Sequence, residues 1–201
     1  MQRYAFRLML AALIIGAAGQ AAAGGWMPGR QVEGVAMEYR TTTSGFHEHR
    51  GETLLCADLH ALEAFVADTS RFPEWVPYTR SARLLDSSDQ AFVYYVRSTT
   101  PWPMQDRDMV YEITRYDEAD GSVRLDVVGL PDFYPEEQNV TRIREAAGEW
   151  RLLEEAEVIS VRYQLYVDPG RVPAFAANRR LASVVGKTLA NLAAHFPCPK
   201  I

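Results

Sequence analysis

Thr100-Pro101-Trp102-Pro103-Met104-Gln105-Asp106-Arg107-Asp108-Met109-Val110 is a stretch that neither a regular helix nor a central strand can hold in full. Each of its two prolines lacks a backbone N–H, so each would interrupt the hydrogen bonding of either element. Each also pushes the residue before it into extended geometry. The stretch therefore predicts a kinked connection that delivers Arg107 and Asp108 into a strand-like segment over 109–114.

The composition is that of a globular domain. The chain has 201 residues, of which 48% are hydrophobic and 23% are charged, with a net charge of −5. This length allows one domain with a substantial core. No block of lysine and arginine and no basic helix occurs in the sequence. Nucleic acid is therefore not an expected partner, nor is strong electrostatic docking on an anionic membrane.

Residues 1–23 have the features of a secretory signal peptide. Arg3 and Arg7 make a positive start, residues 8–18 form an apolar run, and Ala21-Ala22-Ala23 supplies small residues for cleavage. The apolar run is too short for a comfortable membrane span, although an uncleaved N-terminal anchor is the alternative. We expect an exported protein, periplasmic in a bacterium or secreted, with a glycine-rich linker over 24–34.

The chain contains two cysteines, Cys56 and Cys198. An oxidising compartment would make a disulfide between them chemically feasible. A bridge closing so long a loop could contribute about 4 kcal/mol through chain entropy. The alternative is that Cys56 is a buried apolar residue and Cys198 a free thiol in the tail 197–201. A spacing this wide is not a metal or redox motif.

Hydrophobic periodicity predicts a sheet-rich chain. Short runs separated by turn-like clusters, with Ala146-Ala147-Gly148 as one such turn, are typical of an antiparallel meander. In the last run, apolar and polar residues alternate cleanly, so one face of that strand is predicted to be buried and the other solvated. The predicted strands are 35–42, 46–56, 82–85, 91–99, 109–116, 123–128, 140–144, 150–154 and 158–167.

Two helices are predicted. Asp58 is expected to cap a helix over 59–67, and Pro173 to stand in the first turn of a longer helix that Pro197 ends. The longer helix is the element long enough to cover the concave face of a curved sheet. Its apolar face is formed at helical spacing by Leu181, Val185, Thr188, Leu192 and Phe196.

His47 and His49 fall on the same face of the strand predicted over 46–56. Two histidines at this spacing could contribute to a metal site, but no third ligand is close in the sequence and Arg50 adds repulsion. We therefore predict a solvated strand face and no metal.

Three patterns resemble the START (StAR-related lipid-transfer) domain of the helix-grip, or Bet v 1-like, superfamily. Residues 101–110 are similar to its Pro-aromatic-Pro-Met-x-x-Arg-Asp-x-Val stretch. Gly148-Glu149-Trp150 is similar to its turn and aromatic residue before the penultimate strand. Residues 168–178 are similar to the family's Asp-Pro-Gly-Gly-x-Pro-x-x-x-x-Asn start of the closing helix, except that Arg171 replaces the second glycine, which affects the turn shape.

The resemblance covers 35–196 and implies an α+β fold, in which a curved antiparallel sheet grips a long C-terminal helix around a hydrophobic cavity. It implies binding, with transfer or sequestration, of a single lipid or similar hydrophobic molecule, without a cofactor. A cavity enzyme of the cyclase or hydrolase type is the alternative in the same superfamily, and an interaction module with a filled core is a third. No catalytic motif occurs in the sequence, so we do not expect an enzyme. We expect a monomer that can contact a membrane transiently.

Arg107 shares a strand face with Met109, Tyr111 and Ile113, a mostly apolar set of the kind that lines ligand pockets. In phosphatidylcholine-binding members of the family the matching arginine meets the lipid phosphate, whereas a structural ion pair is the alternative for Arg107. Strand alternation points Asp108 the other way. The predicted ligand-binding residues are Arg107, Met109, Tyr111, Ile113, Tyr94, Tyr95, Tyr163 and Phe175.

A loop over 129–135 carries apolar residues between two predicted strands. Since loops carry function disproportionately, Leu130, Phe133 and Tyr134 are predicted to form a gate together with the helix over 173–196. The aromatic residues of the cavity could also cage a quaternary ammonium group. Ordinary core packing is the alternative for them.

Overall fold

The computed structural model describes residues 25–156 and 158–199. The predicted signal peptide, residues 1–23, lies outside the described residues. Of the helices in the described ranges, none combines the length and the apolar character that a membrane crossing requires.

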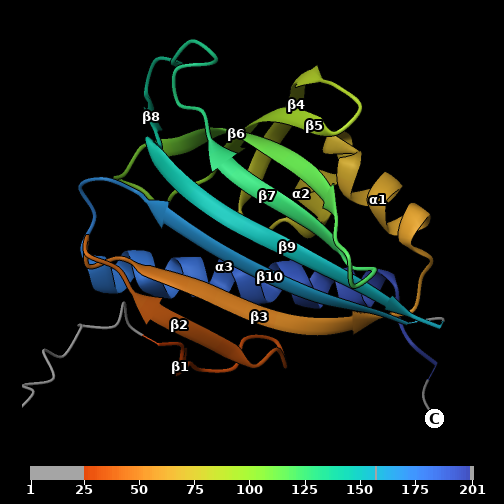
Figure 1. Ribbon diagram of the computed structural model, residues 1–201. Helices are drawn as coiled ribbons and strands as arrows, with labels where there is room; N and C mark the ends of the chain where they lie inside the picture. The colour runs from red at the N-terminus through yellow and green to blue at the C-terminus, as the bar shows by residue number, and fades with distance from the viewer. Residues whose placement is uncertain (1–24, 157, 200–201) are drawn as a thin grey trace, which may run out of the picture.

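One long, curved sheet forms most of the fold (Figure 1). Its strands are β1 (Met27–Pro28), β2 (Met37–Thr41), β3 (His47–Leu55), β4 (Thr79–Ser87), β5 (Ala91–Ser98), β6 (Asp106–Asp117), β7 (Val123–Gly129), β8 (Val140–Arg142), β9 (Glu145–Glu155) and β10 (Val158–Asp168). They are ordered β1-β2-β3-β10-β9-β7-β6-β5-β4, and β8 pairs with β6. All pairings are antiparallel except the β6–β8 pair, which is parallel. The pairing of β3 with β10 joins the first strands to the last.

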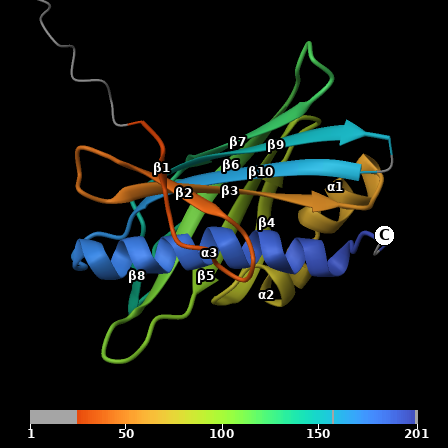
Figure 2. The same cartoon turned by 90° about the horizontal axis from the view of Figure 1, so that it is seen from below.

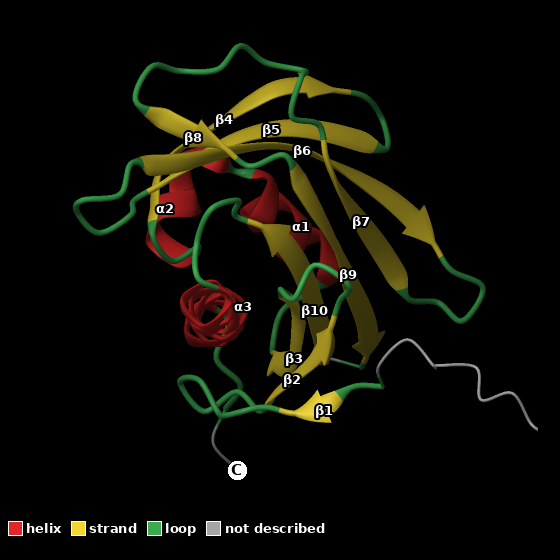
Figure 3. Cartoon of the chain, turned by 90° about the vertical axis from the view of Figure 1, so that its left-hand side faces the viewer, coloured by secondary structure: helices red, strands yellow, loops and turns green. Residues whose placement is uncertain are grey.

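The helices lie on the concave side of this sheet (Figures 2 and 3). They are α1 (Leu59–Ala67), a short 3-10 turn η1 (Thr69–Arg71), α2 (Phe72–Trp75) and α3 (Ala174–His195). Asp58 caps α1 as predicted, because its Oδ1 accepts a hydrogen bond of 2.8 Å from the Ala61 N–H. Pro173 precedes the first residue of α3, also as predicted. The predicted α+β helix-grip architecture is therefore confirmed.

Gly186, in the middle of α3, lets the helix approach the N-terminal segment closely. A Cβ at this position would lie 2.5 Å from the Cβ of Val32. Glycine inside a helix costs about 1 kcal/mol in helix propensity, so this contact explains a residue that would otherwise weaken α3. Val32 is buried and β1 pairs with β2. Part of the predicted linker over 24–34 therefore belongs to the fold.

One predicted turn lies inside a strand. Ala146-Ala147-Gly148 was expected to end a strand over 140–144, but these residues belong to β9, which runs continuously from Glu145. A Cβ on Gly148 would lie 2.7 Å from the carbonyl oxygen of Gln164 on β10. The glycine therefore serves the close approach of two central strands and does not mark a turn.

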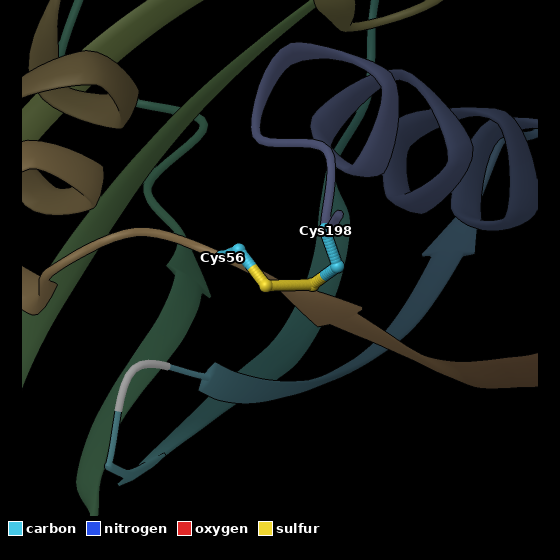
Figure 4. The surroundings of a disulfide bond; sticks show 2 residues. All are labelled: Cys56 and Cys198. Atoms are coloured by element: carbon cyan, nitrogen blue, oxygen red, sulfur yellow. A yellow bond between two sulfur atoms is a disulfide. The ribbon is translucent and has the colours of Figure 1, made fainter. Parts of the chain in front are cut away.

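Cys56 and Cys198 form a disulfide with an S–S distance of 2.08 Å (Figure 4). The bridge joins the segment that follows α3 to the connection between β3 and α1. Beside it, the Cys56 N–H donates a hydrogen bond of 3.1 Å to the carbonyl oxygen of Phe196. The C-terminal end of α3 is thus linked covalently to the connection between β3 and α1.

A buried ion pair lies on the convex side of the sheet. Arg142 donates from Nε to Asp108 Oδ1 at 2.9 Å and from Nη2 to Asp108 Oδ2 at 3.0 Å, and both side chains are 1% exposed. Arg142 also donates to the carbonyl oxygens of Pro131, Tyr134 and Pro135, which secures the connection between β7 and β8. The hydrogen bonds to Asp108 raise the pKa of Arg142.

Breaking the disulfide is expected to weaken the fold. The bridge spans a sequence separation of 142 residues, and loss of a constraint of this size costs about 4–5 kcal/mol of unfolding free energy in the chain-entropy model. We expect a Cys56→Ser/Cys198→Ser variant to unfold at lower denaturant concentration than the wild type. Dithiothreitol should shift the wild type toward the variant and leave the variant unchanged. Equal midpoints for the oxidised wild type and the variant would contradict this expectation.

Removal of Arg142 is expected to be far more damaging than removal of a nearby exposed arginine. Arg142→Met would leave the Asp108 carboxylate buried without its partner, at a cost of about 3–5 kcal/mol. Arg144→Met is the matched control, because the Arg144 side chain is 59% exposed and pairs with Asp132 and Glu136 at the surface. Exposed pairs contribute about 1 kcal/mol or less. Urea unfolding measures both variants, and similar losses for the two would refute a special role for the buried pair.

Candidate ligand-binding cavity

A cavity of about 850 Å³ lies between the concave face of the sheet and α3. Period-two alternation builds one wall, because Val161, Tyr163 and Leu165 of β10 point inward together. Helical spacing builds the opposite wall, where Leu181, Val184, Thr188 and Leu192 of α3 face the sheet. The lining is predominantly apolar, which is the usual character of a site for a hydrophobic molecule.

Aromatic side chains from several elements surround the middle of the cavity. The Tyr94 and Tyr111 rings lie 5.8 Å apart on neighbouring strands, and Tyr163 stacks on Trp150 with 3.7 Å between ring centroids. Burial raises the pKa of Tyr94 to about 12 and also raises the pKa of Tyr111 and Tyr163. All three hydroxyls therefore stay protonated near neutral pH and can donate a hydrogen bond to a bound molecule.

Exposed lining residues show that the cavity reaches the surface at two opposite ends. Figure 2 shows the β5–β6 loop on the same side of the molecule as the start of α3. One end, here called the loop end, is formed by Thr100, Pro101, Met104, Pro169, Val172 and Ala176. The other, the α1 end, is formed by His60, Glu63, Ala64, Ala67, Asp89 and Phe92.

The two ends differ in how their charges are paired. At the α1 end, Arg115 donates to Glu63 at 2.9 Å and to Asp117 at 2.6 Å, so its charge is compensated. At the loop end, the acceptors of Arg107 within residues 25–156 and 158–199 are the carbonyl oxygen of Pro169 at 3.3 Å and Thr100 Oγ1 at 3.4 Å. Both of these acceptors are neutral. Burial lowers the pKa of Arg107, consistent with a cation that lacks a close counter-charge.

Six of the eight predicted ligand-binding residues line the cavity: Arg107, Met109, Tyr111, Ile113, Tyr94 and Tyr163. The other two do not. Tyr95 points to the convex side of β5, because adjacent residues of a strand face opposite ways, and it packs there with Val93 and Val110. Phe175 is 79% exposed on the outside of α3. The placement of these two residues corrects the prediction.

The predicted gate is also misplaced. Leu130 and Tyr134 pack against the convex-face cluster around Tyr95, and neither they nor the exposed Phe133 line the cavity. The reason is the ion pair of Asp108 with Arg142, which draws this loop to the convex side of the sheet. The segments that border an opening are instead the β5–β6 loop and the start of α3.

The strand face with His47 and His49 is not solvated as predicted, because α3 covers it. Asn178 of α3 accepts a hydrogen bond of 2.8 Å from the His47 N–H, and the His49 ring is buried. Tyr39 stacks on His47 at 4.7 Å. Burial, with a smaller contribution from the charge of His47, lowers the pKa of His49 to about 4. Among the described residues, no group of three or more potential ligands gathers to hold a metal ion.

The sequence prediction missed several lining residues, notably Trp75, Trp150 and Arg180. Arg180 is not one of the residues that form the predicted apolar face of α3, yet it lines the cavity. A usable signal was present, because Arg180 precedes Val184, Thr188 and Leu192 at intervals of four residues and so shares their side of the helix. Trp75 carried no such signal, since α2 is a single turn.

Comparison with known proteins gives matches over most of the chain. A family model described as "Polyketide cyclase / dehydrase and lipid transport" matches residues 57–193. An uncharacterized protein of Pseudomonas aeruginosa is 30% identical over 188 residues, which make up 92% of this chain and 93% of that protein.

Solved structures match the fold closely. A STAR-related lipid transfer protein of Xanthomonas axonopodis is 30% identical with a TM-score of 0.79, over 86% of this chain and 98% of that chain. The lipid transfer and protein localization domain of human StarD13 is 12% identical with a TM-score of 0.72, over 87% of this chain and 91% of that chain. The second likeness concerns the fold alone.

Acidification is expected to destabilise the protein through His49. Its folded pKa of about 4 lies below the ordinary value of 6.5, so the unfolded chain binds a proton that the folded chain excludes. The unfolding free energy should therefore fall as the pH is lowered from about 6.5 to about 4, by up to about 3 kcal/mol.

Urea unfolding at a series of pH values measures this dependence. A His49→Gln variant should lose most of the slope in that window, whereas a variant of the exposed His60, His60→Gln, should keep it. An unchanged slope in His49→Gln would show that the acid sensitivity arises elsewhere.

Proposed function

The chain belongs to the polyketide cyclase / dehydrase and lipid transport family and has a START-type helix-grip fold, and on this basis we propose that it binds a single lipid or similar hydrophobic molecule and transfers or sequesters it. The observation that carries the proposal is the apolar cavity of about 850 Å³ under α3. Each buried methylene of an acyl chain contributes about 0.8 kcal/mol. A chain of ordinary lipid length can thus offset the entropic cost of binding.

The position and the hydrogen-bond partners of Arg107 support a contact between its guanidinium group and the polar headgroup of a bound lipid. Arg107 lines the cavity at the loop end, and its hydrogen-bond partners within the described part of the chain are neutral. The salt bridges of the described residues do not include it, although Asp106 and Asp108 flank it in sequence. A structural ion pair, the alternative from the sequence, therefore finds no support.

The loop end supports a role as the route of exchange with a membrane. Trp102 is 92% exposed, and Phe175 and Met104 are also exposed close by in the same loop and helix start. Tryptophan is enriched at membrane interfaces, where its ring meets apolar chains and its N–H meets water. Since the disulfide holds the far end of α3, opening would take place at the start of this helix. This gate replaces the one predicted over 129–135.

We propose a carrier and not an enzyme. The titratable side chains Tyr94, Tyr111 and Tyr163 in the middle of the cavity have a raised pKa, so they stay protonated near neutral pH and are poor general bases. At the α1 end, the Glu63 carboxylate is engaged by Arg115. The predicted signal peptide and the disulfide support an exported location, in a bacterial periplasm or outside the cell.

Native mass spectrometry of the protein purified from its own host tests the proposal. We expect one hydrophobic molecule bound per monomer. Val184→Trp, which adds an indole to the cavity wall, should lower the occupancy at least about fivefold, because it fills the space that the ligand needs. Ala194→Trp is the control, since Ala194 is exposed on α3 and does not line the cavity.

The identity of the bound molecule separates the two candidate functions. A lipid with acyl chains supports a carrier, whereas a polycyclic aromatic product would support a cyclase. Full occupancy in Val184→Trp, or a wild type that carries no apolar molecule and takes none up from lipid vesicles, would refute the cavity as the binding site.

A further inference from the structure

The loop end of the cavity holds two guanidinium groups, from elements far apart in the sequence. Arg107 comes from β6 and Arg180 from the second turn of α3, and both line the cavity. Both side chains are partly buried. Two like charges at one end of an apolar space repel each other and lose hydration, so an arrangement of this kind needs compensation.

The protein does not supply that compensation with a carboxylate. Neither arginine takes part in a salt bridge between described residues. The two acids next to Arg107 are committed elsewhere, since Asp106 pairs with Arg80 and Arg97, and Asp108 pairs with Arg142. The sequence of α3 contains no aspartate or glutamate.

Arg180 is nevertheless held in place by neutral groups. It donates to the carbonyl oxygen of Thr99, and its guanidinium lies 4.1 Å from the centroid of the Tyr78 ring. Tyr78 has a positive φ of 66°, which is uncommon for an aromatic residue, and its hydroxyl lies 3.0 Å from Ser183 Oγ. A strained residue thus helps to orient a cation on the cavity wall. Burial lowers the pKa of Arg180, and the nearby charge of Arg107 adds to the lowering.

We propose that Arg107 and Arg180 together bind the anionic group of an amphiphile, a carboxylate or a phosphate at the end of an apolar chain. The inference rests on the proposed function, and it narrows the ligand from any hydrophobic molecule to one that carries a negative charge. Guanidinium groups suit both anions, because their planar N–H donors match carboxylate and phosphate oxygens. Arg180 is the new element of this site, since it joins the headgroup position to the helix that covers the cavity.

Anion binding would also favour closure of the loop end. Arg180 spans from α3 to the β5–β6 loop through its hydrogen bond to Thr99. An anion held by Arg107 of β6 and Arg180 of α3 would link the two sides of this opening and remove the repulsion between the two cations. A neutral ligand of the same length would gain only the apolar contacts.

Matched pairs of probes test the proposal on the delipidated full chain. The first pair is 11-(dansylamino)undecanoic acid and its methyl ester, which share a chain and differ in one negative charge. The second is dodecyl phosphate and dodecanol, used as competitors for the dansyl probe. We expect the wild type to bind the acid at least about 10-fold more tightly than the ester. Lauric acid serves as a further competitor. Whichever of lauric acid and dodecyl phosphate displaces the dansyl probe more strongly identifies the preferred headgroup as a carboxylate or a phosphate.

Three variants assign the effect to the two arginines. Arg180→Gln and Arg107→Gln should each weaken binding of the acid about 5-fold or more and leave binding of the ester within about 2-fold. Arg179→Gln is the matched control, because it removes the same charge from the neighbouring, exposed position of α3. It should leave both affinities unchanged. Circular dichroism and thermal unfolding verify that each variant keeps the fold.

The outcomes separate this inference from the function it rests on. Equal affinity of the wild type for acid and ester would overturn the anion site while leaving the hydrophobic cavity as the binding site. Equal losses in Arg180→Gln and Arg179→Gln would show a general electrostatic effect and overturn the role of Arg180. Failure of the wild type to bind any of the probes would contradict the proposed function itself, and the anion site with it.

Discussion

A buried ion pair between Asp108 of β6 and Arg142 of β8 sets the orientation of the strand on which the cavity depends. Because adjacent residues of a strand face opposite ways, the burial of Asp108 on the convex side turns Arg107 toward the concave side. Burial removes water from both charged side chains, which is unfavourable. The bidentate hydrogen bonds between Arg142 and Asp108 and the donation from Arg142 to backbone carbonyl oxygens offset this penalty. One arginine–carboxylate contact thus decides which cation enters the cavity and which stays outside.

The long helix α3 closes the cavity, and its two ends are attached to the rest of the protein by different kinds of interaction. A disulfide fixes the segment after its last turn. Its first turns are held by hydrogen bonds: Asn178 accepts from the His47 N–H, and Arg180 donates to the carbonyl oxygen of Thr99. A covalent link restrains the chain in every conformation, while hydrogen bonds exchange with water at little net cost. The two ends of α3 therefore differ in how readily they separate from the sheet, and the charged end of the cavity lies at the end held by hydrogen bonds.

The sequence predicted the architecture more accurately than it predicted the residues of the ligand-binding cavity. Proline stiffening, clean alternation over 158–167 and the spacing of apolar residues in α3 are local properties, and the elements that they predicted are present. The site needed more than local pattern. Alternation along β6 correctly placed Arg107 and Tyr111, but it could not show that the loop carrying Tyr134 turns to the convex face. Nor could it show that α3 covers His49, because this contact joins residues that are far apart in the sequence.

By itself, the sequence determined most of the strands and the two longer helices, where the chain kinks before Arg107, and that one face of the last strand is buried. Backbone geometry and side-chain period carry this information within a few residues. Only the tertiary structure decided that Arg180 lies at the same end of the cavity as Arg107, and that the acids beside Arg107 pair with other arginines. These relations depend on the curvature of the sheet and on which distant elements meet across it, and no local pattern encodes them.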